Sequence, residues 1–411
     1  MKNFSFQSYR FSLILVAALI IGTGLGLILK EKAVVFKPFG DIFLNLLFTA
    51  VVPLVFFSIS SAVASMGNGA RLGRILGIMM LIFIATGIVS SILMVVAVSI
   101  YPPAQGVQVA LEMPPAHQKL SVAEALVRTF TVSDFSDLLS KKNMLALIVF
   151  SVLTGLAALH TAEKGRAFTQ FLVSANNVFA RVIALIMLYA PVGLGAYFAY
   201  LTGVFGPQLS GSYFRAVTLY YPLAFGYFFF AFTFYAWLAA GAFGIKGFWI
   251  NIIPTSLTAL ATGSSLASVP VNLAAAKKTG VPEDIREVVI PIGATIHMEG
   301  SCLSAVLKIA FLFGIFQMDF SDPAVLLSAV GVALLSGTVM SGIPSGGFLG
   351  EVLIVTLYGF PIEALPIISM IGVLIDPPAT MVNAVGDNVS SMLIARILGG
   401  PQWLKANDQV S

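Results

Sequence analysis

The chain has 411 residues, of which 58% are hydrophobic and only 10% are charged, and its formal net charge is +4. Ordinary soluble domains carry about 25% charged residues, so this composition excludes a typical water-soluble protein. The small positive charge is spread over several segments and does not indicate nucleic-acid binding. The single cysteine, Cys302, cannot form an internal disulfide.

Long apolar segments follow one another from the N-terminus. Residues 11–29 and 75–100 are each long enough to cross a ~30 Å hydrocarbon core as a helix. The first segment lacks a small-residue cleavage site, so we expect a retained helix rather than a signal peptide. The sequence therefore predicts a multi-pass membrane protein, with helices in this half at 11–29, 38–66, 74–101, 143–160, 166–203 (broken near Pro191) and 213–243.

A polar insertion at 102–141 is predicted to be an extramembrane loop because it is rich in proline and polar residues. Basic residues indicate the orientation, since Lys and Arg are enriched in cytoplasmic loops. Lys2 and Arg10 precede the first helix, which places the N-terminus inside.

The second half differs, because glycine, serine and proline interrupt its apolar segments at mid-membrane depth. The interruptions are GSSLASVP within residues 255–276 and SGIPSGG within residues 334–355. The flanking apolar stretches are too short to cross a membrane alone, so we predict two re-entrant helical hairpins, at 246–278 and 323–360. An interrupted long helix is predicted after each hairpin, the breaks being GATIHMEGS (293–301) and LIDPPATMVNAVGD (374–387).

Repeated breaks of this kind point to a transporter. Lipid cannot satisfy freed backbone N–H and C=O groups, so non-helical backbone is tolerated at membrane depth only where it is buried in protein or lines a cavity. Paired broken segments in corresponding positions of two repeats mark the binding site of a secondary transporter. We therefore expect substrate and cation between the hairpin tips and the broken helices.

The hairpin tip ending in Pro270, the segment GATIHMEG, the tip SGIPSGG and the run TMVNAVGD resemble the dicarboxylate/amino acid:cation symporter family over nearly the whole chain. The resemblance implies an all-α, inverted-repeat, elevator-type symporter with about eight transmembrane helices plus two re-entrant hairpins. It also implies a homotrimer in the plasma membrane, of the bacterial inner-membrane type. The implied scaffold comprises helices 1–2 (1–70) and the loop with helices 4–5 (102–210), and the transport domain comprises helix 3 (71–101) and residues 211–411, with helix 7 at 284–317 and helix 8 at 363–398.

The same resemblance implies roles for individual residues. Asp376 falls where the family binds a substrate α-amino group, and Asn383 with Asp387 falls where it holds a sodium ion. The implied substrate site is Ser264, Ser265, Ser301, Ile343, Gly347, Asp376, Ala379, Thr380 and Asn383, and the implied sodium ligands are Gly293, Thr295, Asn383 and Asp387.

Three residues depart from the family's usual Asn-Met-Asp-Gly-Thr motif: His297 and Glu299 replace its Asn and Asp, and Ser301 replaces its Thr. The hydroxyl-rich patch expected in helix 3 retains only Thr86. A hydrogen-bonded core histidine and an internal ion pair are the structural alternatives. The functional hypothesis is a proton or altered cation site, because two titratable groups two positions apart on a buried segment can hold a proton between them. We expect co-transport of sodium, protons or both, with a reduced sodium stoichiometry.

Gly263 and Ala379 occupy the two positions at which acidic-substrate members place an arginine. Without a guanidinium, a substrate's side-chain carboxylate has no bidentate partner. The sequence therefore favours a small neutral amino acid, and a C4-dicarboxylate or acidic amino acid remains the alternative.

Four further alternatives concern charged residues and function class. Asp376 precedes two prolines and could be a helix N-cap. Lys308 and Glu351 are expected at similar depth, where an ion pair would offset their burial. An ion channel is the rival class, separable by coupled uptake. An enzyme is disfavoured, because the sequence shows neither a nucleophile with its base nor a metal-ligand spacing.

Overall fold

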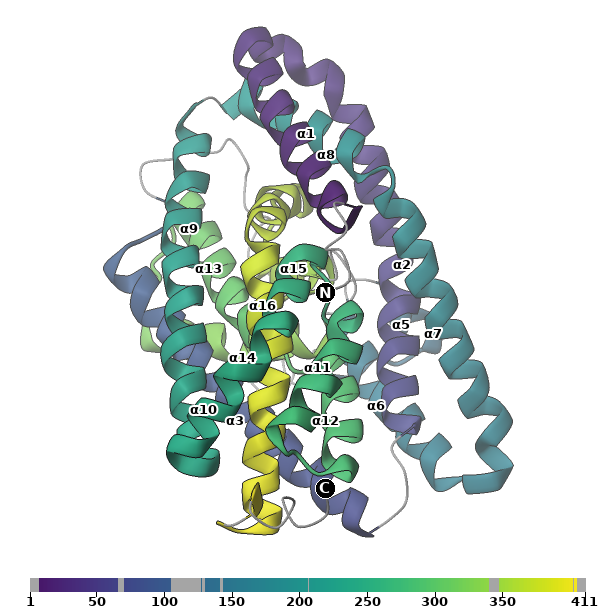
Figure 1. Cartoon of the computed structure of the whole chain (residues 1–411). Coiled ribbons are helices and arrows are strands. Elements are labelled where there is room, and N and C mark those ends of the chain that lie inside the picture. The colour runs from purple at the N-terminus through teal and green to yellow at the C-terminus, as the bar shows by residue number, and fades with distance from the viewer. Residues whose placement is uncertain are drawn as a thin grey trace.

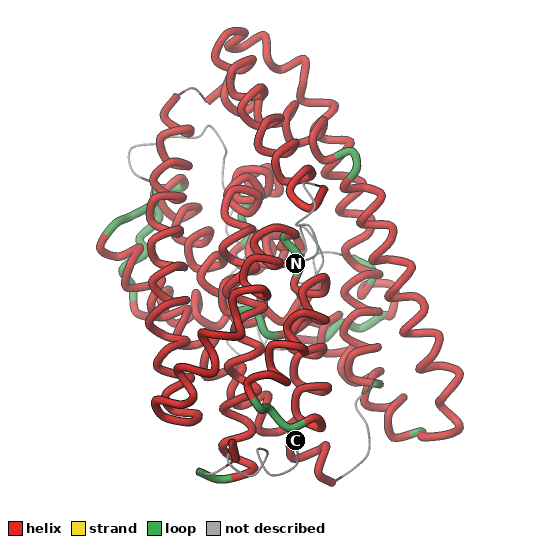
Figure 2. Tube along the Cα trace, in the orientation of Figure 1, coloured by secondary structure: helices red, strands yellow, loops and turns green. Residues whose placement is uncertain are grey.

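The computed structural model describes residues 7–65, 70–104, 127, 130–140, 143–205, 207–339, 347–401 and 403–404. Every regular element in these ranges is a helix, and Figure 2 shows helical tube joined by short loops. The all-α prediction is confirmed. Most of the polar insertion at 102–141 lies outside the described residues, so its extramembrane position stays a prediction.

One group of helices packs around α2. The predicted break near Pro191 is present, since α7 ends at Met187 and α8 begins at Ala190. In Figure 1 this group occupies the upper and right-hand part of the molecule. Its members are α1 (Gln7–Leu29), η1 (Lys30–Phe36), α2 (Lys37–Ala64), α5 (Phe135–Leu138), α6 (Met144–His160), η3 (Ala162–Gly165), α7 (Arg166–Met187) and α8 (Ala190–Phe205).

The second group packs around α16, the yellow helix that runs through the centre of Figure 1. Contacts between the two groups are fewer than those within each, the α1–α10 and α8–α9 contacts being examples. The members are α3 (Ala70–Ile100), α9 (Pro207–Gly226), the π-helical turn η4 (Tyr227–Ala231), α10 (Phe232–Thr262), α11 (Ser265–Thr279), α12 (Glu283–Ile296), α13 (Glu299–Ile315), α14 (Pro323–Val339), α15 (Gly347–Tyr358), η5 (Ile362–Ala364) and α16 (Leu365–Gly399).

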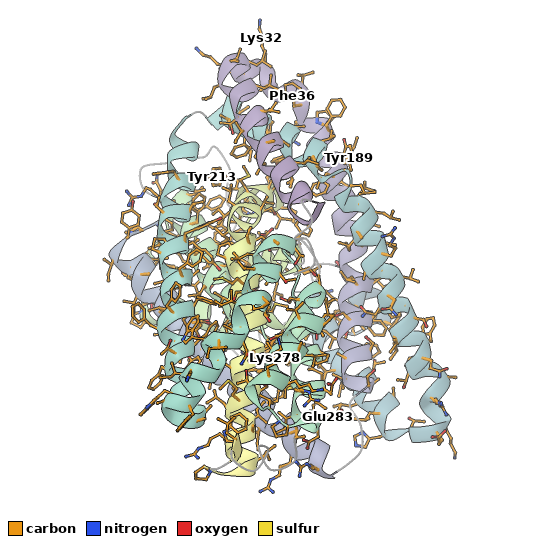
Figure 3. All side chains as sticks on the ribbon, viewed as in Figure 1. Lys32, Phe36, Tyr189, Tyr213, Lys278 and Glu283 are labelled. Atoms are coloured by element: carbon orange, nitrogen blue, oxygen red, sulfur yellow. The ribbon has the colours of Figure 1, made fainter. Side chains whose placement is uncertain are left out.

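Several helices have the length and composition of membrane spans. Among the described residues, five stretches qualify: 73–100, 163–186, 211–262, 283–315 and 362–399. Large apolar side chains such as Phe230 and Phe243 are 81% and 78% exposed, as expected for surfaces that face lipid. Three labelled charged side chains lie toward the ends of the molecule, Lys32 at the top of Figure 3 and Lys278 and Glu283 low in the view.

Glycines allow α1 and α8 to cross closely. A side chain at Gly22 would collide with the Gly195 carbonyl oxygen, and one at Gly26 would collide with the Ala199 carbonyl oxygen. Small residues four positions apart are the usual way in which membrane helices bring their backbones together. This crossing fixes the two helices relative to each other.

Gly22→Ala is expected to destabilise the protein by about 1–3 kcal/mol, because the added methyl overpacks the crossing. Gly24→Ala is the matched control, since a Cβ there meets no atom within 4 Å. The melting temperature of each detergent-solubilised variant measures the effect, and it should fall only for Gly22→Ala. Equal melting temperatures would contradict the close crossing.

The segment predicted as the first hairpin contains two helices joined by a sharp turn. Gly263 ends α10 with φ +58°, a left-handed conformation that favours glycine. Ser264 is the N-cap of α11, and its Oγ accepts a hydrogen bond from the Ala267 N–H. Upstream, Ala240 and Gly241 break α10 with non-helical dihedrals and separate the segment from the preceding helix.

The second predicted hairpin contains α14 and α15. The residues that join them, 340–346, include the predicted site residue Ile343 and the predicted tip residue Pro344, and both lie outside the described residues. The described arms lie within the predicted range 323–360, and the re-entrant course of this segment stays a prediction.

The interruption predicted in GATIHMEGS is present. His297 has φ −106° and ψ 97°, and Met298 has φ −128° and ψ 61°, so both residues leave the helical region between α12 and α13. The turn is held by the His297 N–H, which donates to the Gly293 carbonyl at 2.8 Å. His297 therefore lies in a true break in the helix, and Glu299 is the first residue of the helix that follows.

The interruption predicted in the last helix is wrong, because α16 is continuous from Leu365 to Gly399. Pro378 cannot donate to the Leu374 carbonyl four residues earlier, which would normally weaken the helix. The Tyr221 hydroxyl donates to that carbonyl instead, at 2.9 Å. The side chain of a neighbouring helix thus replaces a missing hydrogen bond, and the helix passes through both prolines. Asp376 lies inside α16, so it is not an N-cap.

Candidate functional site

A cavity of about 50 Å³ lies where α13, α15 and α16 meet α2 and α8. One water needs roughly 10–15 Å³, so the space suits a small solute. Ser301, Ser304 and Lys308 line it from one face of α13, as their spacing requires. The other described lining residues are Phe43, Leu194, Gly347, Phe348, Glu351, Ser369, Gly372, Val373, Ile375, Asp376 and Ala379.

Asp376 and the first helix–turn–helix meet beside this cavity. A Cβ on Gly263 would lie 2.9 Å from Asp376 Oδ2, so the turn lies directly against the carboxylate. A longer side chain at 263 would collide with that carboxylate and would strain the left-handed backbone. The glycine is required by geometry, and it leaves Asp376 without an arginine at this position.

Asn383 connects the last helix to the break between α12 and α13. Its Oδ1 accepts hydrogen bonds from the N–H groups of Gly300 and Ser301, at 2.8 and 3.2 Å. Its Nδ2 donates to Ser301 Oγ at 3.1 Å. The first N–H groups of a helix have no partner within the helix, so Asn383 caps α13. Its side-chain oxygen is therefore already engaged by these two N–H groups.

The ion pair expected from the sequence is present in the cavity. Lys308 Nζ lies 2.7 Å from Glu351 Oε1, and the Ser369 hydroxyl donates to Glu351 Oε2 at 2.5 Å. Both charged side chains are only 2% exposed. Gly372 permits this approach, because any side chain there would collide with Glu351 Oε1.

A second cluster of buried side chains surrounds His297, which lies in the break between α12 and α13. Its Nδ1 lies 3.0 Å from Asp387 Oδ1, and its Nε2 lies 2.9 Å from Thr86 Oγ1. Phe83 stacks on the imidazole with ring centroids 3.9 Å apart. Thr86, the one hydroxyl in the IFIAT segment at 82–86, thus contacts the substituted histidine directly.

Glu299 completes this cluster. Its Oε1 accepts a hydrogen bond from the Tyr227 hydroxyl at 3.0 Å and lies 3.8 Å from His297 Nε2. Tyr227 also lies 3.2 Å from the hydroxyl of Tyr235. His297 is therefore in closer contact with Asp387 than with Glu299, the partner that the sequence suggested.

Two carboxylate oxygens in the cluster have no partner. Glu299 Oε2 and Asp387 Oδ2 are fully buried and accept no hydrogen bond from the described residues. Gly386 lies against Glu299 Oε2, and Gly293 lies against Asp387 Oδ1, where side chains would collide. A buried carboxylate needs a compensating positive charge or a proton, so these oxygens are the natural contacts for a coupled cation.

Most of the described site residues that the sequence predicted lie in these two places. The cavity brings together Ser301, Gly347, Asp376 and Ala379, with Ser264 and Ser265 at the adjoining turn. The buried cluster brings together Gly293, His297, Glu299 and Asp387. Thr380 is buried one turn beyond Asp376, and the Thr295 hydroxyl bonds the carbonyl of Ile292 in its own helix.

Sequence reasoning missed the tyrosines. Tyr227 lies in the π-helical turn η4, and the Tyr220 hydroxyl donates to the Gly300 carbonyl at 2.8 Å. Both hydroxyls are buried in a run dominated by aromatic residues, YYPLAFGYFFF, in which they look like lipid-facing or core side chains. A buried tyrosine usually needs a hydrogen-bond partner, and that is the one signal that could have singled them out.

Comparison with known proteins agrees with this arrangement. The sequence profile of the sodium:dicarboxylate symporter family matches residues 11–397. The chain belongs to this family. The sodium:dicarboxylate symporter family consists of membrane transporters and not of enzymes, which confirms the expected function class.

Individual relatives of this symporter are similar over nearly their whole length. A proton/sodium-glutamate symport protein of Bacillus caldotenax is 28% identical over 394 residues, covering 92% of both chains. A C4-dicarboxylate transport protein of Bacillus subtilis is 24% identical, covering 93% of this chain and 92% of the relative. A proton/glutamate-aspartate symporter of the same organism is 25% identical, covering 95% and 96%. The names agree with co-transport of sodium, protons or both.

Proposed function

We propose that the protein is a secondary active symporter for a small neutral amino acid, coupled to sodium, protons or both, working by alternating access in the plasma membrane. Asp376 receives the substrate's α-amino group in the cavity between α13, α15 and α16. The turn at Ser264 and Ser265 closes the site on one side.

The observation that carries the substrate class is the charge balance of the cavity. Lys308 is the one basic side chain among its described lining residues, and Glu351 neutralises it at 2.7 Å. Gly263 and Ala379 supply no charge. A substrate's side-chain carboxylate would enter a site with two carboxylates and no uncommitted cation, at a cost that a neutral side chain avoids.

The division into two helix groups supports an elevator-type motion. The group around α16 contains the cavity and the His297 cluster, whereas the group around α2 contributes only Phe43 and Leu194 to the cavity. We propose that the first group is the transport domain, with re-entrant hairpins at 246–278 and 323–360. The second group is the scaffold, and three copies assemble through it. Native mass spectrometry of the purified protein tests the homotrimer.

The test of the substrate class is uptake into proteoliposomes with inward sodium and proton gradients. Labelled alanine or serine is expected to accumulate against its own gradient, and aspartate and succinate are expected to compete weakly. Equilibration without accumulation would indicate a channel. Tight binding of aspartate or succinate, with no competition by neutral amino acids, would favour the acidic substrates of the relatives.

Ala379→Arg provides a gain-of-function test. The introduced guanidinium is expected to weaken alanine uptake about tenfold or more and to admit aspartate, because it supplies a bidentate partner for the second carboxylate. Ala379→Met is the matched control, with similar length and no charge. It should weaken alanine uptake without admitting aspartate, so aspartate transport by both variants would refute the charge argument.

A further inference from the structure

One part of the cavity lining, made of Lys308, Glu351, Ser369 and Gly372, is given no contact with the substrate in the function proposed above. Lys308 projects from α13, Glu351 from α15 and Ser369 from α16, so three helices converge on this point. The pair is the one ion pair in the cavity lining, and Gly372 provides the space that it occupies. We call these four residues the ion-pair end.

Stability alone does not account for the pair. Removing two charges from water costs several kcal/mol per ion, and replacing a buried pair by apolar side chains of similar volume is often neutral or stabilising. The surrounding lining is apolar enough to accept such a replacement, as Phe348, Val373 and Ile375 show. A charged pair that lines a solute-sized cavity therefore has a reason to be there beyond packing.

The hydrogen-bond inventory of the pair defines what it can bind. An ammonium group has three donors, and Lys308 uses one of them, on Glu351 Oε1, among the contacts of the described residues. Glu351 accepts one bond on each oxygen, from Lys308 and from Ser369, and each oxygen retains a lone pair. The ion-pair end thus offers donors and acceptors side by side with no net charge.

We propose that the ion-pair end binds the side chain of the substrate and selects an uncharged polar group, an amide or a hydroxyl. The carbonyl or hydroxyl oxygen accepts from Lys308, and the amide N–H or hydroxyl O–H donates to Glu351. This inference rests on the proposed neutral amino acid substrate and narrows it to the polar members of that class. A carboxylate is rejected, because it would have to displace Glu351 and leave that charge unpaired. An aliphatic side chain is disfavoured, because it would leave the free donors of Lys308 without acceptors.

The first test uses the unmodified protein and pairs of substrates that match in shape. Serine is compared with 2-aminobutyrate, and asparagine is compared with leucine, as competitors of labelled alanine uptake. We expect the polar member of at least one pair to bind about tenfold or more tightly, as hydrogen bonds to charged groups allow. Equal or tighter binding of the apolar members overturns the proposal.

The second test removes both charges together. Lys308→Met combined with Glu351→Leu is expected to abolish the preference for the polar competitor, measured as the ratio of the two competitors' binding affinities. The matched control is Lys37→Met with Asp41→Leu, which removes a pair of the same 2.7 Å length at a half-buried site in α2. The control should keep the preference.

The outcomes separate this inference from the proposed function. Alanine uptake without any polar preference in the parent protein, or a preference that survives the double substitution, overturns the role of the ion-pair end alone. Failure of every neutral amino acid to compete overturns the proposed function as well. If the double variant does not fold, the result with the unmodified protein still decides.

Discussion

Asp376→Asn is expected to lower the affinity for an α-amino acid by about a hundredfold or more. The carboxylate lies in the cavity and in the interior of α16, where it caps no helix end. Removing one partner of a buried, hydrogen-bonded charge pair typically costs about 2–5 kcal/mol, because the other charge is left without compensation. Asparagine has nearly the same shape as aspartate, so the substitution removes the charge and leaves the size of the side chain unchanged.

The measurement is equilibrium binding of labelled alanine to the detergent-solubilised protein at saturating cation. The control ligand is lactate, in which a hydroxyl replaces the amino group of alanine. Lactate should bind the parent protein weakly and should lose little or nothing in the Asp376→Asn variant. If alanine and lactate lose affinity equally, Asp376 holds the site together and does not bind the amino group.

The sequence predicted the parts of this fold that depend on local composition. The long apolar segments, the break near Pro191 and the non-helical pair at His297 and Met298 all follow from residues close together in the chain. The continuity of α16 did not follow, because the hydroxyl that replaces the missing proline donor comes from Tyr221, on another helix. A rule about proline in one helix cannot anticipate a donor from elsewhere.

The site was predictable to a similar extent. Lys308 and Glu351 were expected to pair because both were placed at similar depth, where an unpaired charge is costly. The contact between His297 and Asp387 spans 90 residues, and no local pattern indicates it. The sequence suggested Glu299 as the nearer partner because the two residues are neighbours in the chain. The break in the helix turns their side chains differently, so proximity in sequence was misleading.

The unusual His297 cluster has consequences for cation coupling. Glu299 and Asp387 are both 1% exposed, and His297 is the basic group in contact with both. With a neutral imidazole and two ionised carboxylates, the cluster carries two uncompensated negative charges in a low-dielectric interior. Such a site must gain positive charge before it can cross a hydrophobic barrier. Sodium and protons can both supply it.

The hydroxyl of Thr86 allows His297 and Asp387 to hold either one or two protons between them. Thr86 Oγ1 lies 2.9 Å from His297 Nε2 and 3.3 Å from the Phe83 carbonyl, and it has one hydrogen to donate. When it donates to His297, the imidazole carries its hydrogen on Nδ1, facing Asp387. When it donates to the Phe83 carbonyl, its oxygen can only accept from His297 Nε2, which must then carry a hydrogen. The hydrogen bond between His297 Nδ1 and Asp387 Oδ1 then requires one more proton, on either of these two atoms. Rotation of one hydroxyl therefore accommodates one additional proton on His297 and Asp387.

We therefore predict that a proton replaces part of the sodium requirement. In proteoliposomes, an inward proton gradient alone should drive uptake by the parent protein, and the number of sodium ions per substrate should be lower than in the comparison variant. That variant combines His297→Asn with Glu299→Asp, which supplies an amide oxygen in place of the imidazole and shortens the carboxylate. It should depend on the sodium gradient and lose the response to pH.

His160→Asn is the matched control for this experiment, since His160 is exposed and forms a hydrogen bond with the carbonyl of Leu156 in its own helix. It should keep the response of the parent protein to both gradients. Reversal potentials measured under separately imposed sodium and pH gradients give the two stoichiometries. A parent protein in which the pH gradient drives nothing, and whose sodium count equals that of the double variant, would show that the His297 cluster is a structural element. Its two unpartnered carboxylate oxygens would then bind sodium alone.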